Sequence, residues 1–558
     1  MARGNEELVF APLGGAGEIG MNLSLYGFGP ARSRKWIAVD LGVAFADERQ
    51  PGIEVIMPDT RFLEDERHNL LAILLTHAHE DHLGAVIDLW PRLQAPVYAT
   101  SFAAGLLRAK MLEHLAHPGP PVPVHEVPLG ATLSLGPFTV EYVTVTHSIP
   151  EPNGLVITVP GASVYHTGDW KIDPTPQIGA PTDVARLKAL GQEGCRAIIC
   201  DSTNALRAGV SPSEGDVYET LKRLIAGAPA RVIVTAFASN VARLRSAARA
   251  AVAAGRRVVV VGRALDRIIA IAQETGYLND VGEFLSEQDF GHLRREEVVA
   301  LVTGSQGEPN AALARIAFNE YRNVELAKGD RVIFSSRTIP GNEKAVGRVQ
   351  NALARAGIEI VTDADDLVHV SGHPRIGELE QMYQWLQPQA AIPVHGEALH
   401  LQAHARIAAR LGVKEVVTAY NGDLVRLWPA PAEKIDELPS GRLHRDGRII
   451  VREDDDSLRL RRRLGFVGFI GVSVVVTAKG ELVAPPEARL IGIPDADAEG
   501  RSVHDLVLDA IDGAIDSIPK ARRKDPELIE TAVRRSARAA VAEAWGKRPV
   551  CEVLVTQV

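Results

Sequence analysis

The chain has few cysteines and few aromatic residues. Its three cysteines form no Cys-x-x-Cys pair, and Cys195 and Cys200 flank the apolar residues 197–199. We therefore expect both in a hydrophobic core, not in a disulfide or a metal site. Aromatic residues make up only 5% of the 558 residues, so alanine, valine, leucine and isoleucine must fill most of the core. A chain of this length is expected to hold several domains.

The chain also lacks long apolar runs and an excess of basic residues. No stretch approaches the roughly 18 apolar residues of a membrane span, and residues 1–7 lack the apolar centre of a signal peptide. We expect a soluble, cytoplasmic protein that does not bind membranes. The formal net charge of −9 argues against a basic coat for nucleic acid. It leaves room for a local positive groove, which divalent metal ions would reinforce.

Residues that bind metals follow directly after an apolar run. Residues 70–75 predict a buried strand, and four potential ligands come next: His77, His79, Asp81 and His82. Because alternate side chains at a strand end face the same way, His77 and His79 can face one metal ion. Asp81 and His82 begin the next helix and can turn toward a second ion. A cluster of surface-loop histidines is the alternative, and the buried strand before it argues against it.

This pattern, His-x-His-x-Asp-His, resembles the signature of the metallo-β-lactamase fold. The resemblance implies a two-sheet αββα sandwich with a dinuclear metal site at the ends of the sheets. It also implies a third ligand motif at His147, in Thr-His-Ser-Ile-Pro, and a bridging aspartate at Asp169, in Thr-Gly-Asp-Trp. Asp40 would support the metal loop by hydrogen bonding, and His166 would be a packed or supporting histidine.

Residues 15–20 match the Gly-x-Gly-x-x-Gly pattern of dinucleotide-binding folds. Such a fold needs a helix after the third glycine, but residues 21–26 predict a strand. We therefore expect these glycines to shape a turn near the active site.

The plain metallo-β-lactamase pattern stops after Asp201. Roughly 160 residues follow before the next histidine motif. In them, apolar strands alternate with alanine-rich helices, as in an inserted α/β domain with a parallel sheet. The chain then has His369-Val370-Ser371-Gly372-His373 and His395, which with Asp201 resemble the motifs of the β-CASP nucleases. The resemblance implies that His395 completes the second metal site.

Several short segments resemble the ribonuclease J family within that group. They are residues 14–22, 237–240, 303–309 and 339–343. The resemblance implies a 5′-to-3′ exonuclease that prefers 5′-monophosphorylated RNA and is also an endonuclease, acting in RNA maturation and mRNA decay. Single-stranded RNA would be its partner. A small C-terminal domain would support a homodimer or homotetramer, and partners in an RNA-degradation complex stay unidentified.

The expected fold is α/β: a metallo-β-lactamase αββα sandwich, an inserted β-CASP α/β domain and a small C-terminal α/β domain. The boundaries we expect are 1–205 for the first part of the sandwich, 206–364 for the insert, 365–440 for the completing part, 441–465 for a linker and 466–558 for the C-terminal domain.

The resemblance also implies the roles of the site residues. The metal ligands would be His77, His79, Asp81, His82, His147, Asp169 and His395. They would hold two divalent ions, for which Zn²⁺ is the first choice, and Mn²⁺ or Mg²⁺ are the alternatives that could support activity. Two such ions lower the pKa of a shared water, whose hydroxide would attack the phosphodiester. Asp81 and His373 would be catalytic, with His373 stabilising the phosphoryl oxygens or protonating the leaving group.

Substrate binding is expected at two places. The scissile phosphate would be held by His369, Val370, Ser371, Gly372 and His373. For His369, the alternative is a role as structural partner of Asp201. Ser239, Ser305 and the backbone amides of residues 304–307 would form a pocket for the 5′-monophosphate, because exposed amides in glycine-rich turns bind anions.

Three other functions compete with this prediction. A DNA-processing β-CASP nuclease would share the metal motifs, and the sequence does not show where a 2′-hydroxyl would be recognised. A non-catalytic RNA-binding subunit would be expected to lack ligands, but all seven positions are filled. A β-lactam hydrolase would leave the insert unexplained.

Overall fold

The computed structural model describes residues 6–113 and 121–558. Residues 1–5, part of the stretch where we expect no signal peptide, lie outside the described residues. The chain divides into two compact units. The first comprises Met1–Ala44 and Ile56–Arg442, and the second comprises Phe45–Val55 and Leu443–Val558. Among the described residues, no helix combines the length and apolar character that crossing a membrane requires.

Two large sheets form the body of the first unit. In order across the first sheet, the strands are β25 (Glu433–Glu437), β24 (Asp423–Trp428), β1 (Glu7–Gly14), β3 (Leu23–Gly29), β4 (Lys35–Val39), β7 (Leu70–Leu74), β8 (Val97–Ala99) and β9 (Val124–Glu126). The second sheet has β10 (Thr132–Leu135), β11 (Phe138–Thr144), β12 (Asn153–Val159), β13 (Ala162–His166), β14 (Ala197–Asp201), β21 (Ala390–Val394) and β23 (Glu415–Val416).

Apolar side chains from both sheets meet in one core. Phe10, Tyr26 and Val39 from the first sheet belong to the same cluster as Phe138 and Leu155 from the second. On the outer face of the second sheet, a further core joins its strands to three helices. These are α5 (Val184–Glu193), α11 (Ile376–Leu386) and α12 (Ala398–Arg410). Cys195 and Cys200 are buried in that core, as predicted.

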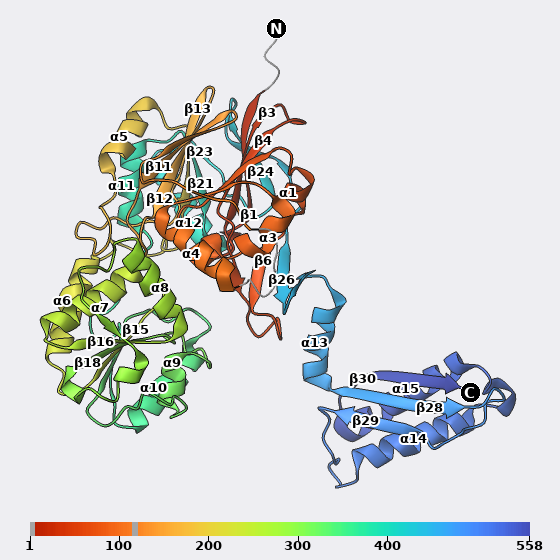
Figure 1. The fold of residues 1–558 in the computed structure, drawn as a ribbon. Coiled ribbons are helices and arrows are strands. Elements are labelled where there is room, and N and C mark those ends of the chain that lie inside the picture. Colours follow the sequence, from red (N-terminus) through yellow and green to blue (C-terminus); the bar gives the residue numbers. More distant parts are fainter. Residues whose placement is uncertain (1–5, 114–120) are drawn as a thin grey trace. The chain divides into compact units, whose positions relative to one another are not determined.

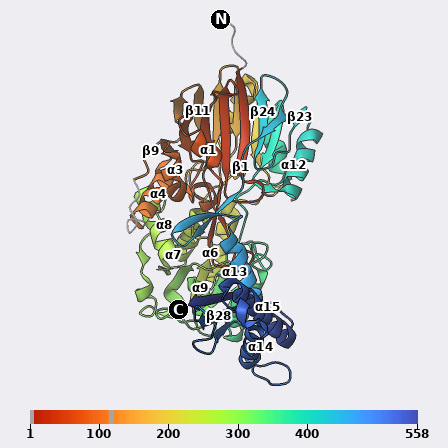
Figure 2. The same cartoon turned by 90° about the vertical axis from the view of Figure 1, so that its right-hand side faces the viewer.

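Helices cover both sides of the paired sheets. Figure 1 shows α5 and α11 on one side and two other helices on the opposite side. Those two are α1 (Arg61–Asp65) and α3 (Val86–Leu93). Helix α4 (Ser101–Glu113) buries Phe102, Leu106 and Leu107. Figure 2 views the first sheet with its long strands side by side. The arrangement is the αββα sandwich that the sequence predicts.

The ligand-bearing loops gather because their strands end at the same edge of each sheet. In the first sheet, β4 and β7 run parallel. In the second, β13, β14 and β21 are parallel, and β11 has the same direction because it is separated from β13 by the antiparallel β12. The loop after each of these strands therefore begins at one end of the sandwich.

The segment between β14 and β21 contains a separate parallel sheet. Its strands, in order, are β17 (Phe284–Leu285), β16 (Arg257–Val261), β18 (Val298–Val302), β15 (Val232–Thr235), β19 (Arg331–Phe334) and β20 (Glu359–Val361). Its larger helices are α6 (Glu214–Ala226), α7 (Val241–Ala253), α8 (Arg263–Glu274), α9 (Ala312–Ala317) and α10 (Glu343–Arg355). Figure 1 shows α6 and α7 on the opposite side of the sheet from α9 and α10. This confirms the inserted α/β domain.

The second unit contains a three-stranded sheet with two helices on one face. The strands are β29 (Glu487–Ile491), β28 (Phe469–Val476) and β30 (Val550–Gln557), and the helices are α14 (Val503–Ser517) and α15 (Pro526–Trp545). Residues 441–465, expected as a linker, contain the paired strands β26 (Arg442–Asp446) and β27 (Ile449–Arg452) and most of α13 (Asp456–Val467). Asp455 caps α13 by accepting from the Ser457 amide, which stabilises the start of this helix.

Candidate metal centre

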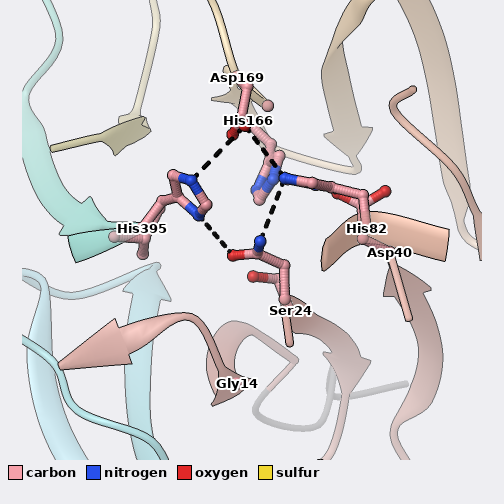
Figure 3. A pocket seen from close by; sticks show the side chains of 10 residues that line it. Gly14, Ser24, Asp40, His82, His166, Asp169 and His395 are labelled. Carbon is pink, nitrogen blue, oxygen red and sulfur yellow. Dashed lines mark hydrogen bonds and ion pairs between the residues drawn. The ribbon is translucent and has the colours of Figure 1, made fainter. Parts of the chain in front are cut away.

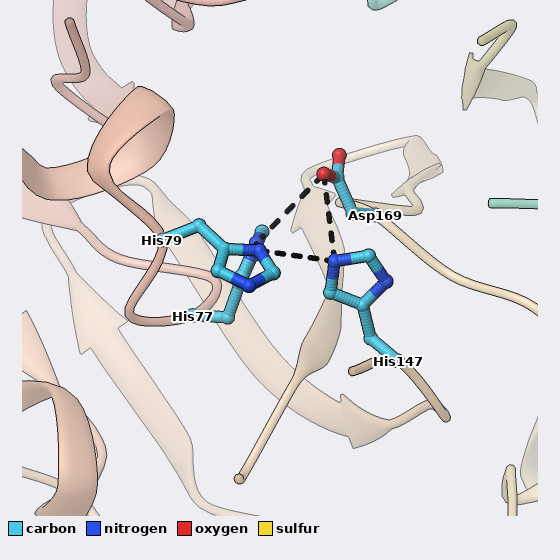
Figure 4. Close-up of side chains that lie close together, drawn as sticks. All are labelled: His77, His79, His147 and Asp169. Atoms are coloured by element: carbon cyan, nitrogen blue, oxygen red, sulfur yellow. Dashed lines mark hydrogen bonds and ion pairs between the residues drawn. The ribbon is translucent and has the colours of Figure 1, made fainter. Parts of the chain in front are cut away.

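Three histidines and an aspartate converge at the end of the sandwich (Figure 4). The Nδ1 atom of His79 lies 3.0 Å from the Nε2 atoms of both His77 and His147. Asp169 Oδ2 lies 3.8 Å from each of those Nε2 atoms. His77, His147 and Asp169 are almost completely buried. Nitrogen and carboxylate oxygen atoms at this spacing are compatible with one divalent metal ion.

A second group of side chains lies around the same oxygen of Asp169. The Oδ2 atom of Asp169 is 3.2 Å from His82 Nε2 and 3.5 Å from His395 Nε2, and Asp81 Oδ2 is 3.6 Å from His82 Nε2. Asp81 and His82 belong to the short helix α2 (Glu80–Leu83), whose N-cap residue is His79. In Figure 3, His82 and His395 point toward Asp169 beside a cavity of about 10 Å³, room for one water molecule. The two groups therefore share one carboxylate, as a bridged pair of metal ions requires.

Four of these histidines have their second ring nitrogen held by a group outside the cluster. The pairs are His77 Nδ1 with Thr76 Oγ1 at 2.9 Å, His82 Nδ1 with Asp40 Oδ2 at 2.7 Å, His147 Nδ1 with the Gly372 carbonyl at 2.7 Å, and His395 Nδ1 with Asn22 Oδ1 at 2.9 Å. Carboxylate, amide and backbone carbonyl oxygens only accept, and Thr76 Oγ1 donates its own proton to Asp40. In the neutral form of each ring, the proton therefore belongs on Nδ1, and the Nε2 lone pair faces the cluster. Metal-binding histidines have this arrangement.

The electrostatics of the cluster favour a bound cation. Burial keeps the pKa of His77 and His147 well below the usual value and lowers that of His79 to about 4, so these rings are neutral. Burial alone would raise the pKa of Asp169, but the surrounding histidines hold it well below its usual value. Burial opposes a charge on His82 as well, yet nearby carboxylates raise its pKa. A divalent cation satisfies the same carboxylates.

Asp40 has the supporting role that the sequence predicts. Its carboxylate accepts from His82 Nδ1, from the Thr76 amide at 2.8 Å and from the Thr76 hydroxyl. It thereby connects the end of β7 to α2. His166 also lies outside both ligand groups, since it is buried with its Nδ1 atom 2.9 Å from the hydroxyl of Tyr26.

The glycine-rich residues 15–20 lie beside the metal centre. The strand β3 follows them in place of a helix, which excludes the dinucleotide-binding alternative. The His395 amide donates to the Gly15 carbonyl at 2.6 Å, and β2 (Ala16–Gly17) pairs with β22 (Gly396–Glu397). Gly15 has φ +82°, a conformation that L side chains rarely adopt. These residues form the expected turn, and it lies beside the candidate metal centre.

Asn22 is a site residue that the sequence reasoning missed. Its amide nitrogen donates to the Asp81 carbonyl at 3.0 Å, while its Oδ1 atom holds His395. One side chain thus contacts two of the predicted ligand segments. The sequence contains a weak signal for it, because Asn22 closes the glycine-rich segment 14–22, but a lone asparagine after a turn has many possible uses.

His373 faces the centre from residues 368–373, which we call the 368–373 loop. Its Nδ1 atom lies 2.8 Å from Asp201 Oδ2 and 3.8 Å from Asp169 Oδ2. Burial lowers the pKa of His373, but these carboxylates outweigh it and raise the pKa to about 9. His373 is therefore the partner of Asp201, and the alternative that assigned this role to His369 is wrong.

His369 lies near the start of the same loop, beside the inserted domain. Its Nδ1 atom is 3.5 Å from Arg243 Nη1, and burial, together with the charges of Arg243 and Arg337, lowers its pKa to about 3. Ser371 Oγ accepts from Asn204 Nδ2 at 2.9 Å, and Val370 is 2% exposed. The loop thus has one histidine, His373, beside the candidate ligand groups and one neutral histidine, His369, beside Arg243 of the inserted domain.

The residues expected to bind the 5′-phosphate belong to the inserted domain. Ser239 is half-buried between β15 and α7, and Ser305 is buried. The Gln306 amide donates to Glu308 Oε2 at 3.1 Å, and the Gly307 amide donates to the Gly304 carbonyl at 3.2 Å. Since those two amides already have acceptors within the chain, an anion would have to displace the Glu308 carboxylate to use the Gln306 amide.

Family models match most of the chain. Residues 36–200 match the "Beta-lactamase superfamily domain" and residues 229–353 match "Ribonuclease J, beta-CASP domain". Residues 357–419 match the "Zn-dependent metallo-hydrolase RNA specificity domain", and residues 457–558 match the "Ribonuclease J C-terminal domain".

Curated proteins with the name ribonuclease J are similar over nearly the whole chain. The protein from Sinorhizobium meliloti is 50% identical, and the alignment covers 99% of this chain and 98% of that protein. The protein from Mycolicibacterium smegmatis is 38% identical over 98% and 96% of the two chains. A crystal structure of a protein of unknown function from Enterococcus faecalis has a TM-score of 0.53 at 16% identity, covers 75% of this chain and 100% of its own, and supports the fold alone.

Proposed function

Because this chain belongs to the ribonuclease J family, we propose that it hydrolyses single-stranded RNA as a 5′-to-3′ exonuclease and as an endonuclease. Its family makes it a hydrolytic ribonuclease of the metallo-β-lactamase superfamily. The exonuclease would prefer a 5′-monophosphate, and the enzyme would act in RNA maturation and mRNA decay.

The observation that carries this proposal is the pair of ligand groups that share Asp169. His77, His79, His147 and Asp169 would hold one divalent ion, and Asp81, His82, Asp169 and His395 would hold the other. The donor set of imidazoles and carboxylates fits Zn²⁺ and also accepts Mn²⁺. When bound, two such ions would activate a water and neutralise the charge that develops on a phosphodiester.

His373 would serve as the proton donor. It faces Asp169 and is held by Asp201, whose carboxylate fixes the ring and favours its protonated form. At neutral pH, a histidine with a raised pKa carries the proton that the leaving 3′-oxygen needs. Cations held by Asp169 would offset part of this rise in pKa and make the proton easier to release. Asp81 would act through the second ligand group.

The neighbouring residues would bind the substrate. We propose that the 368–373 loop, with Val370, Ser371 and Gly372 between its histidines, holds the scissile phosphate. His369 would contribute as a neutral hydrogen-bonding ring. Ser239 and Ser305 of the inserted domain would receive the 5′-monophosphate. The enzyme would be cytoplasmic and would assemble as a homodimer or homotetramer through its C-terminal domain.

RNA labelled internally and carrying a 5′-monophosphate, a 5′-triphosphate or a 5′-hydroxyl tests the proposal. With Zn²⁺, Mn²⁺ or Mg²⁺ added, we expect mononucleotides to appear fastest from the monophosphorylated RNA, together with some longer fragments. Ser239→Ala should narrow the preference for the monophosphate, and an unchanged preference would remove Ser239 from the 5′ pocket. If single-stranded DNA were cleaved and RNA were not, the proposed substrate would be wrong.

A further inference from the structure

Arg243 is a completely buried arginine in the first turn of α7, on the inserted domain. Its Nη2 atom donates to both carboxylate oxygens of Glu214 at 3.0 Å, and its Nε atom lies 3.3 Å from Glu214 Oε2. Glu214 begins α6 and is 1% exposed. A bidentate ion pair between a guanidinium and a carboxylate has one well-defined geometry, so this pair fixes α6 relative to α7.

The third nitrogen of Arg243 reaches the polypeptide next to the metal centre. Its Nη1 atom donates at 2.8 Å to the carbonyl of Val368, and it also contacts the carbonyl and hydroxyl of Ser335 at 2.8 Å. The Ser335 hydroxyl in turn donates to the Val368 carbonyl at 2.6 Å. Val368 is the first residue of the 368–373 loop, so the arginine and the serine hold the start of that loop.

The other end of the loop holds a predicted metal ligand. The Gly372 carbonyl accepts from His147 Nδ1 at 2.7 Å, and His373 pairs with Asp201. A Cβ atom on Gly372 would lie 2.5 Å from the His147 ring, so loop and ring are in direct contact. A displacement of the loop would therefore be transmitted to the imidazole. The Ala242 amide, next to Arg243, also donates to the Ser148 carbonyl at 3.4 Å.

We infer that Arg243, fixed by Glu214, is a positioning residue for the metal centre. It sets the place of the 368–373 loop and, through the Gly372 carbonyl, the orientation of His147. The inserted domain thus has a second role besides contacting RNA, because it completes the hydrogen-bond support of a ligand. The inference rests on the proposed function in so far as His147 binds a metal ion. Arg243 itself is fully buried and belongs to neither ligand group.

The test compares Arg243→Lys and Ser335→Ala with a matched control, Arg256→Lys. A lysine at 243 keeps the positive charge beside Glu214 but cannot reach Val368 and Ser335 as well. Arg256 is also buried in the inserted domain and donates to the Ala230 carbonyl at 2.6 Å. Arg256 directly precedes the amino end of β16, whereas Arg243 lies in the helix that follows the carboxyl end of the parallel strand β15. Four quantities are measured for each full-length protein. They are the Zn²⁺ affinity in competition with a chromophoric chelator, kcat, KM for RNA and the melting temperature.

We expect Arg243→Lys to weaken Zn²⁺ binding at one site and lower kcat, each by about 10- to 100-fold, as for other residues that orient metal ligands. KM should change little, and Ser335→Ala should show a smaller loss in the same two quantities. Arg256→Lys should lower only the melting temperature. Unchanged Zn²⁺ affinity in a folded Arg243→Lys protein would overturn the inference. So would a loss of activity that follows the melting temperature equally in the Arg243 and Arg256 variants.

Two further outcomes are decisive. If Arg243→Lys does not fold, Ser335→Ala decides the question, and wild-type kcat and Zn²⁺ affinity in that variant would contradict a positioning role. If the wild-type protein binds Zn²⁺ but cleaves no RNA, the proposed function fails, whereas the Zn²⁺ affinities of the variants still test the role of Arg243.

Discussion

His147 and Gly372 lie 225 positions apart in the chain, yet the imidazole Nδ1 atom donates to the glycine carbonyl at 2.7 Å. This single contact connects the loop after β11, which precedes the inserted domain in the chain, to the 368–373 loop, which follows it. It also determines which nitrogen of His147 faces Asp169. The geometry of a candidate ligand therefore depends on a residue without a side chain.

Gly372→Ala should damage the metal centre. The new Cβ atom would lie 2.5 Å from His147 Cε1 and Nδ1, so the ring or the loop has to move. We expect a loss of about 10- to 100-fold in metal affinity and kcat, the range for residues that orient metal ligands. The control is Gly347→Ala in α10, where a Cβ atom meets nothing within 4 Å. That change should stabilise the protein by about 1 kcal/mol and leave activity intact. Normal activity of Gly372→Ala would show that His147 tolerates displacement.

Asn22→Ala should weaken the second ligand group. The variant removes the acceptor of His395 Nδ1 and the donor to the Asp81 carbonyl. Metal affinity and RNA cleavage should each fall by about 10- to 100-fold, with little change in KM. Isothermal titration with Zn²⁺ and steady-state kinetics measure both quantities. Asn69→Ala, which alters an asparagine paired with Lys35, is the control and should behave like the wild type. Equal metal binding by the Asn22 and Asn69 variants would argue against an orienting role.

Removal of metal ions should abolish cleavage and lower the melting temperature. The centre brings together five histidines and two carboxylates that a pair of cations would hold. A ligand present at about 1,000 times its Kd stabilises the folded state by about 4 kcal/mol. Dialysis against a chelator, followed by calorimetry and by addition of Zn²⁺ or Mn²⁺, checks this. Asp81→Ala should abolish cleavage while the protein remains folded. Undiminished cleavage by that variant at saturating metal would remove the dinuclear scheme.

His404 should make the protein sensitive to acid. Its ring is fully buried between the Ser202 hydroxyl, 2.8 Å from Nδ1, and the Tyr383 hydroxyl, 2.9 Å from Nε2. Burial lowers its pKa from 6.5 to about 4, so the neutral ring is the form that folding favours. Its stabilising contribution is therefore complete above about pH 6.5 and decreases as the pH falls toward 4. The loss is on the order of 3 kcal/mol.

His404→Gln should flatten this dependence. The free energy of unfolding, measured in urea between pH 4 and pH 7, should change less with pH in the variant than in the wild type. His400→Gln, four positions earlier on a partly exposed part of α12, is the control and should retain the wild-type slope. Identical slopes for all three proteins would show that the pKa of His404 does not differ between the folded and unfolded states.

The local pattern determined the parts of this protein that depend on neighbours in sequence. An apolar run followed by alternating ligands predicts both the strand β7 and the convergence of His77 and His79, because side-chain direction at a strand end follows from the backbone. The parallel sheet of the inserted domain likewise follows from apolar strands that alternate with helices. Family motifs then extended the candidate ligand set to His147, Asp169 and His395.

Only the tertiary structure decided which distant residues support that set. Periodicity did not indicate that Asn22 would hold His395, that Asp201 would pair with His373 and not with His369, or that Arg243 would reach the Val368 carbonyl. Each of these contacts joins segments separated by more than one hundred residues, and each uses a residue type that is common and individually uninformative. Hydrogen bonds of this kind depend on how sheets and inserted domain pack together, and that packing has no local signature in the chain.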